Sequence, residues 1–155
     1  MIIRRAQSKD AKAIAKVLVK SYNIRNEKEG IEVFKTESKK GHRYIVAEEE
    51  GKIVGIVTWL PHGLPKHGLA ELDRIAVLPK MRGKGVAVHL KNVLIKDCQE
   101  WYESKGFHLR KIYLLTHEDN ARARNFYEKM GFKHETTLKE HYYPGRDECV
   151  YSQLL

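Results

Sequence analysis

The sequence predicts a three-layer α/β (α+β) fold in which a mixed sheet lies between helices. Three observations support this prediction. Short runs rich in β-branched residues alternate with helix-period apolar patterns, and glycines or prolines separate them. The 155 residues, 42% hydrophobic and 32% charged, are enough for one substantial core. No repeat, low-complexity tract or linker interrupts the chain, so residues 1–155 are expected to form one domain.

The first half of the chain predicts one strand, two helices and a hairpin. IIRRA is expected to be the first strand, and Ser8 is expected to cap the first helix. A second, weaker helical pattern ends near Gly41. The segment RYIVAEEEGKIVGIVTWL predicts two strands joined by a glycine-containing turn. The defining residues are Ile14, Val17, Leu18 and Ser21 for the first helix, Ile31 and Phe34 for the second, and Tyr44–Glu48 and Lys52–Leu60 for the hairpin.

The second half predicts four strands and two helices after the loop PHGLPKHG. LAELDRIAVL is a strand closed by Pro79, and a long helix runs from Gly83 to about Lys105 and ends at Gly106. RKIYLLTH is a strand, NARARNFYEKM is a helix that Gly131 ends, and two strands flank PGRDE. The element order is therefore β-α-α-β-β-β-α-β-α-β-β. The apolar face of the long helix carries Val86, Leu90, Val93, Leu94 and Trp101.

Composition excludes several classes of protein. No stretch approaches the roughly 20 apolar residues that cross a bilayer, and the opening MIIRRAQSKDAKAIAK lacks a signal-peptide segment. The only cysteines, Cys98 and Cys149, stand far apart, so we expect neither a disulfide framework nor a metal site, and we expect a cytoplasmic location. The net charge of +9 is compatible with anionic partners, but it is also compatible with a basic composition that has no specific function. Because the basic residues are scattered and no nucleic-acid motif is present, nucleic acid is not an expected partner.

The segment VLPKMRGKGVAVHL, at a strand-to-helix junction, is the first functional candidate. The free N–H groups and positive dipole end of a helix attract anions, and glycines let the backbone approach a ligand closely. Arg82 and Lys84 would add charge to such a site. The spacing fits neither GxGxxG nor a P-loop. On this segment alone, an anion site and a plain turn with solvated basic residues both remain open.

A second segment makes the pattern specific. RGKGVA fits the Arg/Gln-x-x-Gly-x-Gly/Ala signature of the GCN5-related N-acetyltransferase (GNAT) superfamily through Arg82, Gly85 and Ala87. NARARNFYEKMGF is similar to the family's Asn-x-x-Ala…Phe-Tyr-x-Lys-x-Gly-Phe pattern, and IIRRAQSKDAKAIAKV resembles its first strand and helix. The chain thus resembles this superfamily over nearly its whole length, which implies a GNAT-like sheet of six to seven strands with about four helices.

The resemblance implies acetyl-CoA as cosubstrate, and no His-x-x-x-His or mixed Cys/His spacing in the sequence suggests a metal. The loop would hold the pyrophosphate through backbone N–H groups, the preceding strand would offer main-chain groups to the pantetheine arm, and the strand Lys111–Thr116 would splay away from it. Asn120 would contact the cofactor or act as a simple helix cap. The implied cofactor residues are Ile75, Ala76 and Val77 on the strand, Arg82, Gly83, Lys84, Gly85, Val86 and Ala87 on the loop, and Asn120.

The implied reaction moves an acetyl group from a thioester to a primary amine by direct attack. An amine attacks only when deprotonated, and the pKa is about 7.7–8 for an α-amine and about 10.4 for Lys, so a base helps. Glu71 is the expected base, with Asp73 on the same strand face as the fallback, acting directly or through water. Tyr127 is the expected acid for the departing thiolate, and a backbone N–H near Val77 would polarise the carbonyl.

The acceptor is less well specified. Bacterial ribosomal-protein N-terminal acetyltransferases carry a Glu five residues before the motif Asn, where this chain has Leu115, which weakens that assignment. Tyr142 and Tyr143 in the last hairpin favour a peptide or protein amine over a polyamine or amino acid. His62, His67 and His117 are alternative bases; His62 and His67 are expected to be solvated loop residues, and His117, at a strand end, could neighbour the cofactor. A non-catalytic acetyl-CoA-binding module remains an alternative, and a homodimer is compatible with the sequence.

Overall fold

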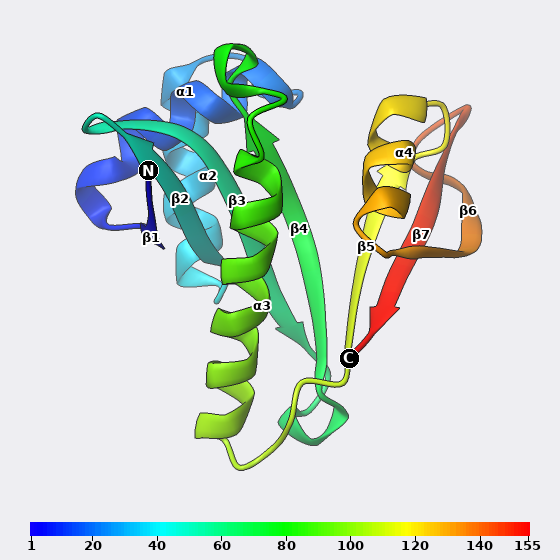
Figure 1. Cartoon of the computed structure of the whole chain (residues 1–155). Coiled ribbons are helices and arrows are strands. Elements are labelled where there is room, and N and C mark those ends of the chain that lie inside the picture. The colour runs from blue at the N-terminus through cyan, green and yellow to red at the C-terminus, as the bar shows by residue number, and fades with distance from the viewer.

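The computed structural model describes all residues, 1–155, as one mixed seven-stranded sheet with four α-helices (Figure 1). The strands lie in the order β1-β2-β3-β4-β5-β7-β6, and only β4 and β5 run parallel to each other. No helix is both long enough and apolar enough to cross a membrane. The elements are β1 (Ile2–Arg5), α1 (Ala11–Ser21), α2 (Glu27–Lys39), β2 (Arg43–Glu49), β3 (Lys52–His62), β4 (Leu69–Val77), α3 (Val86–Ser104), β5 (Lys111–His117), α4 (Ala121–Lys129), β6 (Lys133–Tyr143) and β7 (Arg146–Leu154).

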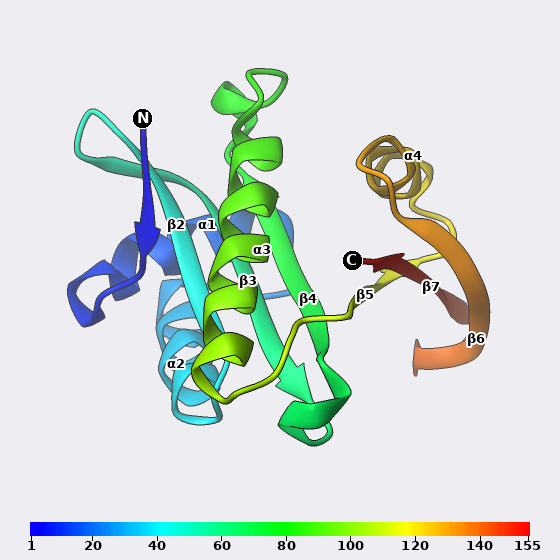
Figure 2. The same cartoon turned by 60° about the horizontal axis from the view of Figure 1, so that its bottom comes forward.

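The helices form one layer on each face of the sheet, as the sequence predicts (Figures 1 and 2). Helices α1 and α2 bury one cluster, which includes Ile14, Leu18 and Phe34, against one face. Helices α3 and α4 bury a larger cluster, which includes Leu90 and Tyr127, against the other. The predicted three-layer architecture and its element order are therefore confirmed.

Two predicted helix starts were wrong. Ser8 does not cap α1 but lies in a 3-10 turn at Ser8–Asp10, in which the Asp10 carboxylate accepts a hydrogen bond from the Gln7 N–H at 2.7 Å. Helix α3 begins at Val86 rather than at Gly83, because Gly83 and Gly85 adopt left-handed φ angles of 76° and 78° that a helix cannot include. The glycines therefore belong to the loop before the helix.

The parallel pair β4–β5 stays together over only three register pairs. Leu69, Ala70 and Glu71 pair with Lys111, Ile112 and Tyr113, and beyond Glu71 the two strands diverge (Figure 2). On the other edge of β4, Thr58 pairs with Arg74 and Trp59 with Leu72, so Asp73 is an extra residue that forms a β-bulge. A bulge bends its strand and increases the local twist, which directs the second half of β4 away from β5.

The buried carboxylate of Asp97 links helix α3 to the sheet through hydrogen bonds. Asp97 accepts hydrogen bonds from Arg5 Nε at 2.7 Å, from Arg43 Nε at 2.9 Å and from Trp59 Nε1 at 2.9 Å. Burial alone would raise the pKa of Asp97, but the hydrogen bonds that its carboxylate accepts outweigh burial and lower the pKa. The donors come from the ends of β1 and β2 and from β3, so one side chain ties the helix to three strands.

We expect Asp97→Ala to destabilise the fold by about 3–5 kcal/mol, because it leaves the buried Trp59 N–H and the half-buried Arg43 guanidinium without an acceptor. Since the folded pKa lies below the unfolded one, this contribution is full above the unfolded pKa and is lost as the pH falls through the folded pKa. Urea unfolding at several pH values should therefore show a gap between wild type and variant that narrows in acid. Asp119→Ala, which removes an exposed carboxylate paired with Arg146, is the control and should leave the midpoint nearly unchanged. An equal shift in both variants would contradict the anchoring role of Asp97.

Candidate active site

One large cavity occupies the space where β4 and β5 diverge. It has a volume of about 1230 Å³ and is lined by residues of both halves of the sheet. One wall comes from β4, the loop after it and the end of α1, and the other comes from β5, α4 and the β6–β7 hairpin. The cavity contacts nearly every residue that the sequence singled out, namely Glu71, Asp73, Ile75, Ala76, Val77, Arg82, Gly83, Gly85, Val86, Ala87, Asn120, Tyr127, Tyr142 and Tyr143; Lys84 lies in the same loop outside its lining.

The glycine loop forms the end of the cavity at the start of α3. A Cβ added at Gly83 or Gly85 would meet no atom within 4 Å, so these positions are glycine for their positive φ and leave the backbone open to a ligand. The first N–H groups of α3 have no acceptor within the helix. Cationic Lys20, Arg82 and Arg122 also line the cavity. The local geometry therefore fits a phosphate-bearing group.

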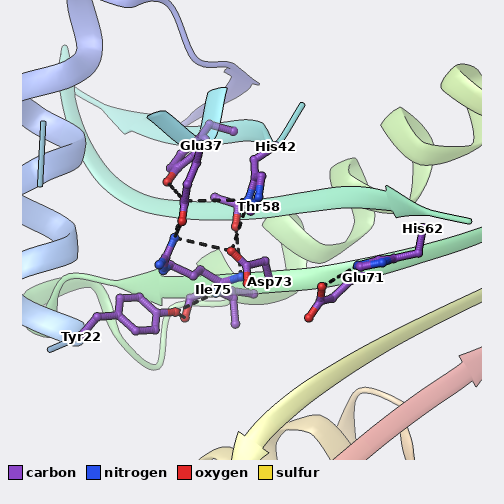
Figure 3. Close-up of polar contacts among 10 residues, drawn as sticks. Tyr22, Glu37, His42, Thr58, His62, Glu71, Asp73 and Ile75 are labelled. Carbon is purple, nitrogen blue, oxygen red and sulfur yellow. Dashed lines mark hydrogen bonds and ion pairs between the residues drawn. The ribbon is translucent and has the colours of Figure 1, made fainter. Parts of the chain in front are cut away.

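The free edge of β4 is occupied by side chains of the protein itself. The Tyr22 hydroxyl accepts a hydrogen bond from the Ile75 N–H at 3.0 Å and donates one to the Ile75 carbonyl at 3.0 Å (Figure 3). Arg82 Nε donates to the Val77 carbonyl at 3.1 Å. The main-chain groups of Ile75 and Val77 thus face the gap rather than β3, and Tyr22, which the sequence did not single out, covers those of Ile75.

Glu71 is paired with a histidine on the neighbouring strand. Its carboxylate lies 2.8 Å from His62 Nε2 (Figure 3). The centroid of the His62 ring lies 5.4 Å from that of the Tyr113 ring. Burial raises the pKa of Glu71, the hydrogen bond with His62 lowers it, and the nearby Asp73 carboxylate raises it, with a net upward shift. The prediction that His62 is a solvated loop residue was wrong, because β3 continues through Pro61 to His62. A proline normally ends a central strand, so the sequence pattern pointed to a loop.

Asp73 belongs to a separate group of charges. Asp73 lies 3.5 Å from Arg74 Nη1 and 3.5 Å from His42 Nδ1, and Arg74 also pairs with Glu37 of α2 (Figure 3). Burial raises the pKa of Asp73, and the positive charge of Arg74 opposes that shift. Because Arg74 is already the counter-ion of this group, Asp73 is less free than Glu71 to act on a substrate.

Tyr127 places a phenol group at the wall of the cavity. The residue is 9% exposed and packs edge-on against Phe126 and Phe132, with ring centroids at 5.5 and 6.1 Å. Its hydroxyl has no hydrogen-bond partner within the chain, and burial raises the pKa of Tyr127. The group therefore stays protonated through the neutral range and can donate a hydrogen bond to whatever enters the cavity.

The remaining candidates lie around the rim. Asn120 Oδ1 accepts a hydrogen bond from the Ala123 N–H at 3.1 Å, which is the helix cap that the sequence left as one alternative. Tyr142 and Tyr143 are exposed, and Asn23 Nδ2 donates to the Tyr143 hydroxyl at 3.3 Å. This contact joins the α1–α2 loop to the β6–β7 hairpin across the cavity.

Three residues of the site were not predicted from the sequence. They are Tyr22, His62 as the partner of Glu71, and Glu148, which lies on β7 and also lines the cavity. A weak signal existed for Glu148, since it stands at the same alternation phase as Val150 and Ser152 in its strand. Tyr22 carried no signal, because it follows the end of α1 and reaches a strand 53 residues away.

Comparison with known proteins agrees with this arrangement. The model of the acetyltransferase (GNAT) family matches residues 11–132. The chain is 33% identical over 103 residues to YjgM, an uncharacterized N-acetyltransferase of Escherichia coli, a match that covers 66% of this chain and 58% of that one. It is 32% identical over 114 residues to N-acetylaspartate synthetase of Xenopus tropicalis (74% and 39% covered) and 31% identical over 115 residues to an N-alpha-acetyltransferase of Sulfurisphaera tokodaii (67% and 64% covered). The chain thus spans less than two thirds of each of these relatives.

Solved structures share the fold. An aminoglycoside 6'-N-acetyltransferase complexed with coenzyme A superposes with a TM-score of 0.82 over 99% of this chain and 97% of that chain. The two sequences are only 17% identical, so the likeness concerns the fold alone.

Proposed function

The chain belongs to the GNAT acetyltransferase family, and from that premise we propose that it transfers the acetyl group of acetyl-CoA to a primary amine. One observation carries the proposal. A single cavity connects the glycine loop and its cations to Glu71, and Tyr127 lies along its wall. An anion site at one end and an enclosed base with a raised pKa at the other are what a phosphorylated acyl donor and an amine acceptor need.

The donor would lie along the free edge of β4. The amides of the first turn of α3 would hold the pyrophosphate, and Arg82 would add positive charge beside them. Main-chain groups of Ile75 and Val77 would then pair with the amides of the pantetheine arm. In this arrangement the Tyr22 hydroxyl must leave Ile75 and the Arg82 guanidinium must leave the Val77 carbonyl when the donor binds, because they occupy these backbone groups.

Glu71 and Tyr127 would handle the protons. The Glu71 carboxylate takes a proton from the incoming ammonium group, and the amine lone pair then forms a bond to the thioester carbon. The nitrogen then releases its second proton, and as the carbon–sulfur bond breaks, its electron pair leaves with sulfur and Tyr127 donates its phenolic proton to the thiolate. The N–H of Val77, on the free edge of β4, would stabilise the developing negative charge on the carbonyl oxygen.

A peptide or protein amine is the acceptor that we favour. Glu71, Asp73 and Glu148 line the acceptor end; Arg74 and Arg146 line the same cavity, but Arg74 is paired with Glu37 and Asp73, and Arg146 with Asp119. The carboxylate of Glu71, which has no Arg or Lys partner, suits a cationic amine better than a free amino acid, whose own carboxylate it would repel. Exposed Tyr142 and Tyr143 at the rim can contact a peptide backbone. One observation favours a slender small-molecule amine instead: the contact between Asn23 and Tyr143 narrows the entrance.

The donor site has a direct test. Coenzyme A should raise the melting temperature, since a ligand at 100 times its Kd stabilises the native state by about 2.7 kcal/mol. Arg82→Ala should reduce the shift at equal ligand concentration, while adenosine, which carries no phosphate, should give none. Differential scanning fluorimetry measures all three. A wild-type chain that does not respond to saturating coenzyme A would contradict the cofactor assignment.

The assignment of the base predicts a characteristic pH profile. Glu71→Gln should lower turnover by about 100-fold or more near neutral pH, the usual size of general-base catalysis. The deficit should be greatest between the raised pKa of Glu71 and the pKa of the amine, because above the latter the amine no longer needs a base. The acid limb that wild type shows through the pKa of Glu71 should be absent from the variant.

Tyr127→Phe is the matched comparison for that profile. It should lower turnover by a similar factor at every pH, because the phenol stays protonated throughout the range, and it should leave coenzyme A affinity nearly unchanged. Steady-state rates from pH 5.5 to about 9.5 separate the two variants. If Glu71→Gln keeps the wild-type profile, Glu71 is not the base and Asp73 or a water relay takes its place.

The acceptor class can be read from the release of coenzyme A thiol. Peptides with a free N-terminus and peptides with an internal Lys should be acetylated with a kcat/KM at least tenfold above that of spermidine or any free amino acid. Mass spectrometry then locates the acetyl group on the α-amine or the side chain. A preference for spermidine would instead establish the small-amine alternative.

A further inference from the structure

A second carboxylate–imidazole pair lies in the cavity, apart from Glu71 and His62. His117 ends β5, and Glu148 is its direct cross-strand partner on β7. His117 Nδ1 and Glu148 Oε1 are in ion-pair contact, both atoms are closed off from solvent, and neither has another partner. The Glu148 side chain is only 3% exposed. A carboxylate in this position holds the imidazole in one orientation and one tautomer.

The Tyr143 ring packs against the same imidazole, with ring centroids 6.0 Å apart, but the second ring nitrogen of His117 has no partner. His117 Nε2 has no hydrogen-bond partner within the chain, and the side chain keeps 30% of its surface exposed at the wall of the cavity. Because Nδ1 faces a carboxylate, the neutral ring carries its proton there and its lone pair on Nε2. The pair therefore presents a proton acceptor to the cavity.

Strand register places this pair on the same face of the sheet as Glu71. Glu71 pairs with Tyr113, and the side chains of Leu115 and His117 follow on the same side at two-residue steps along β5. Glu71 on β4 and Glu148 on β7 thus lie on opposite sides of Leu115. Glu71, Asp73 and Glu148 all line the same cavity, together with the rim residue Tyr142.

We propose that His117, positioned by Glu148, is a second proton acceptor in the acetyl transfer. This inference rests on the proposed function. An acceptor that arrives as an ammonium group must lose two protons before it becomes an amide. Glu71 takes the first and frees the lone pair that forms the carbon–nitrogen bond.

The nitrogen then carries a positive charge and two protons, and His117 Nε2 takes one of them before the carbon–sulfur bond breaks. The thiolate receives its proton from Tyr127. Of the two protons taken by Glu71 and His117, one returns to Tyr127 through solvent and the other is released. The sum is one ammonium ion and one thioester converted to one amide, one thiol and one proton.

Glu148 is a positioning residue in this scheme, and its role can be read without turnover. Nitrogen-15 NMR of histidine-labelled wild type should show His117 with its proton on Nδ1, and Glu148→Gln should change that tautomer or its exchange with water. A proton on Nε2 in the wild type would overturn the proposal, because Nε2 could then accept nothing. This measurement is independent of acetyl-CoA and of the acceptor.

The kinetic test uses a variant that avoids a buried, unpaired carboxylate. The double variant His117→Ala with Glu148→Gln should melt close to wild type, should keep its response to coenzyme A and should lose about 100-fold in turnover. Added imidazole should restore part of that loss by entering the space that His117 leaves. His108→Ala, which removes an exposed histidine outside the cavity, should be unchanged and insensitive to imidazole.

The outcomes separate the two proposals. Turnover within twofold of wild type in the double variant, or a loss that imidazole does not restore, would assign the pair a structural role that joins β5 to β7, and Glu71 would remain the only base. A wild-type chain that binds coenzyme A but acetylates no amine would overturn the proposed function itself.

Discussion

The separation of β4 and β5 is the constraint on which the rest of the site depends. Two parallel strands that stayed in register would satisfy each other's backbone groups and leave no room for a ligand. Here pairing ends after Glu71 and Tyr113, and the bulge at Asp73 turns β4 away. The main-chain groups of Ile75 are therefore exposed to the gap, where burial without a partner would be costly. In this structure the Tyr22 hydroxyl is the hydrogen-bond partner of both backbone groups of Ile75, so neither group is left unpaired without a ligand.

The separation of β4 and β5 also gives the cavity a positive end and a negative end. The C-terminal end of β4 leads into the glycine loop and the start of α3, where backbone amides and arginines gather. Its N-terminal half carries Glu71 and Asp73, and the opposite wall contributes Glu148. A phosphorylated donor and a cationic acceptor are thus drawn to different ends of one space. The net charge of +9 does not predict this separation of positive and negative groups, because a sum over the whole chain does not say which carboxylates lie inside the cavity.

Sequence predictions were most successful where function depends on neighbours along the chain. The glycine loop, its arginine and the following helix are contiguous, so their arrangement follows from local backbone preferences, and only the helix start was misplaced by three residues, at Val86 instead of Gly83. The layer order followed from the alternation of apolar periods. Errors arose where a tertiary contact overrides a local preference. Proline normally ends a central strand, so Pro61 suggested a loop, but pairing with β4 extends β3 to His62.

The sequence by itself determined the order of elements, the apolar faces of the helices and the pair of motifs that identified the family. These depend on spacing and on backbone conformation, which are properties of short segments. Only the tertiary structure decided which side chains meet: Tyr22 with Ile75, His62 with Glu71, and His117 with Glu148, the last pair 31 residues apart, from His117 to Glu148. For the two pairs of histidine and carboxylate the physical reason is strand register, since a shift of one residue between β3 and β4, or between β5 and β7, would turn one member of the pair to the opposite face. That register is specified by packing across the whole sheet rather than by any one segment, and Tyr22 reaches β4 because α1 packs against the sheet.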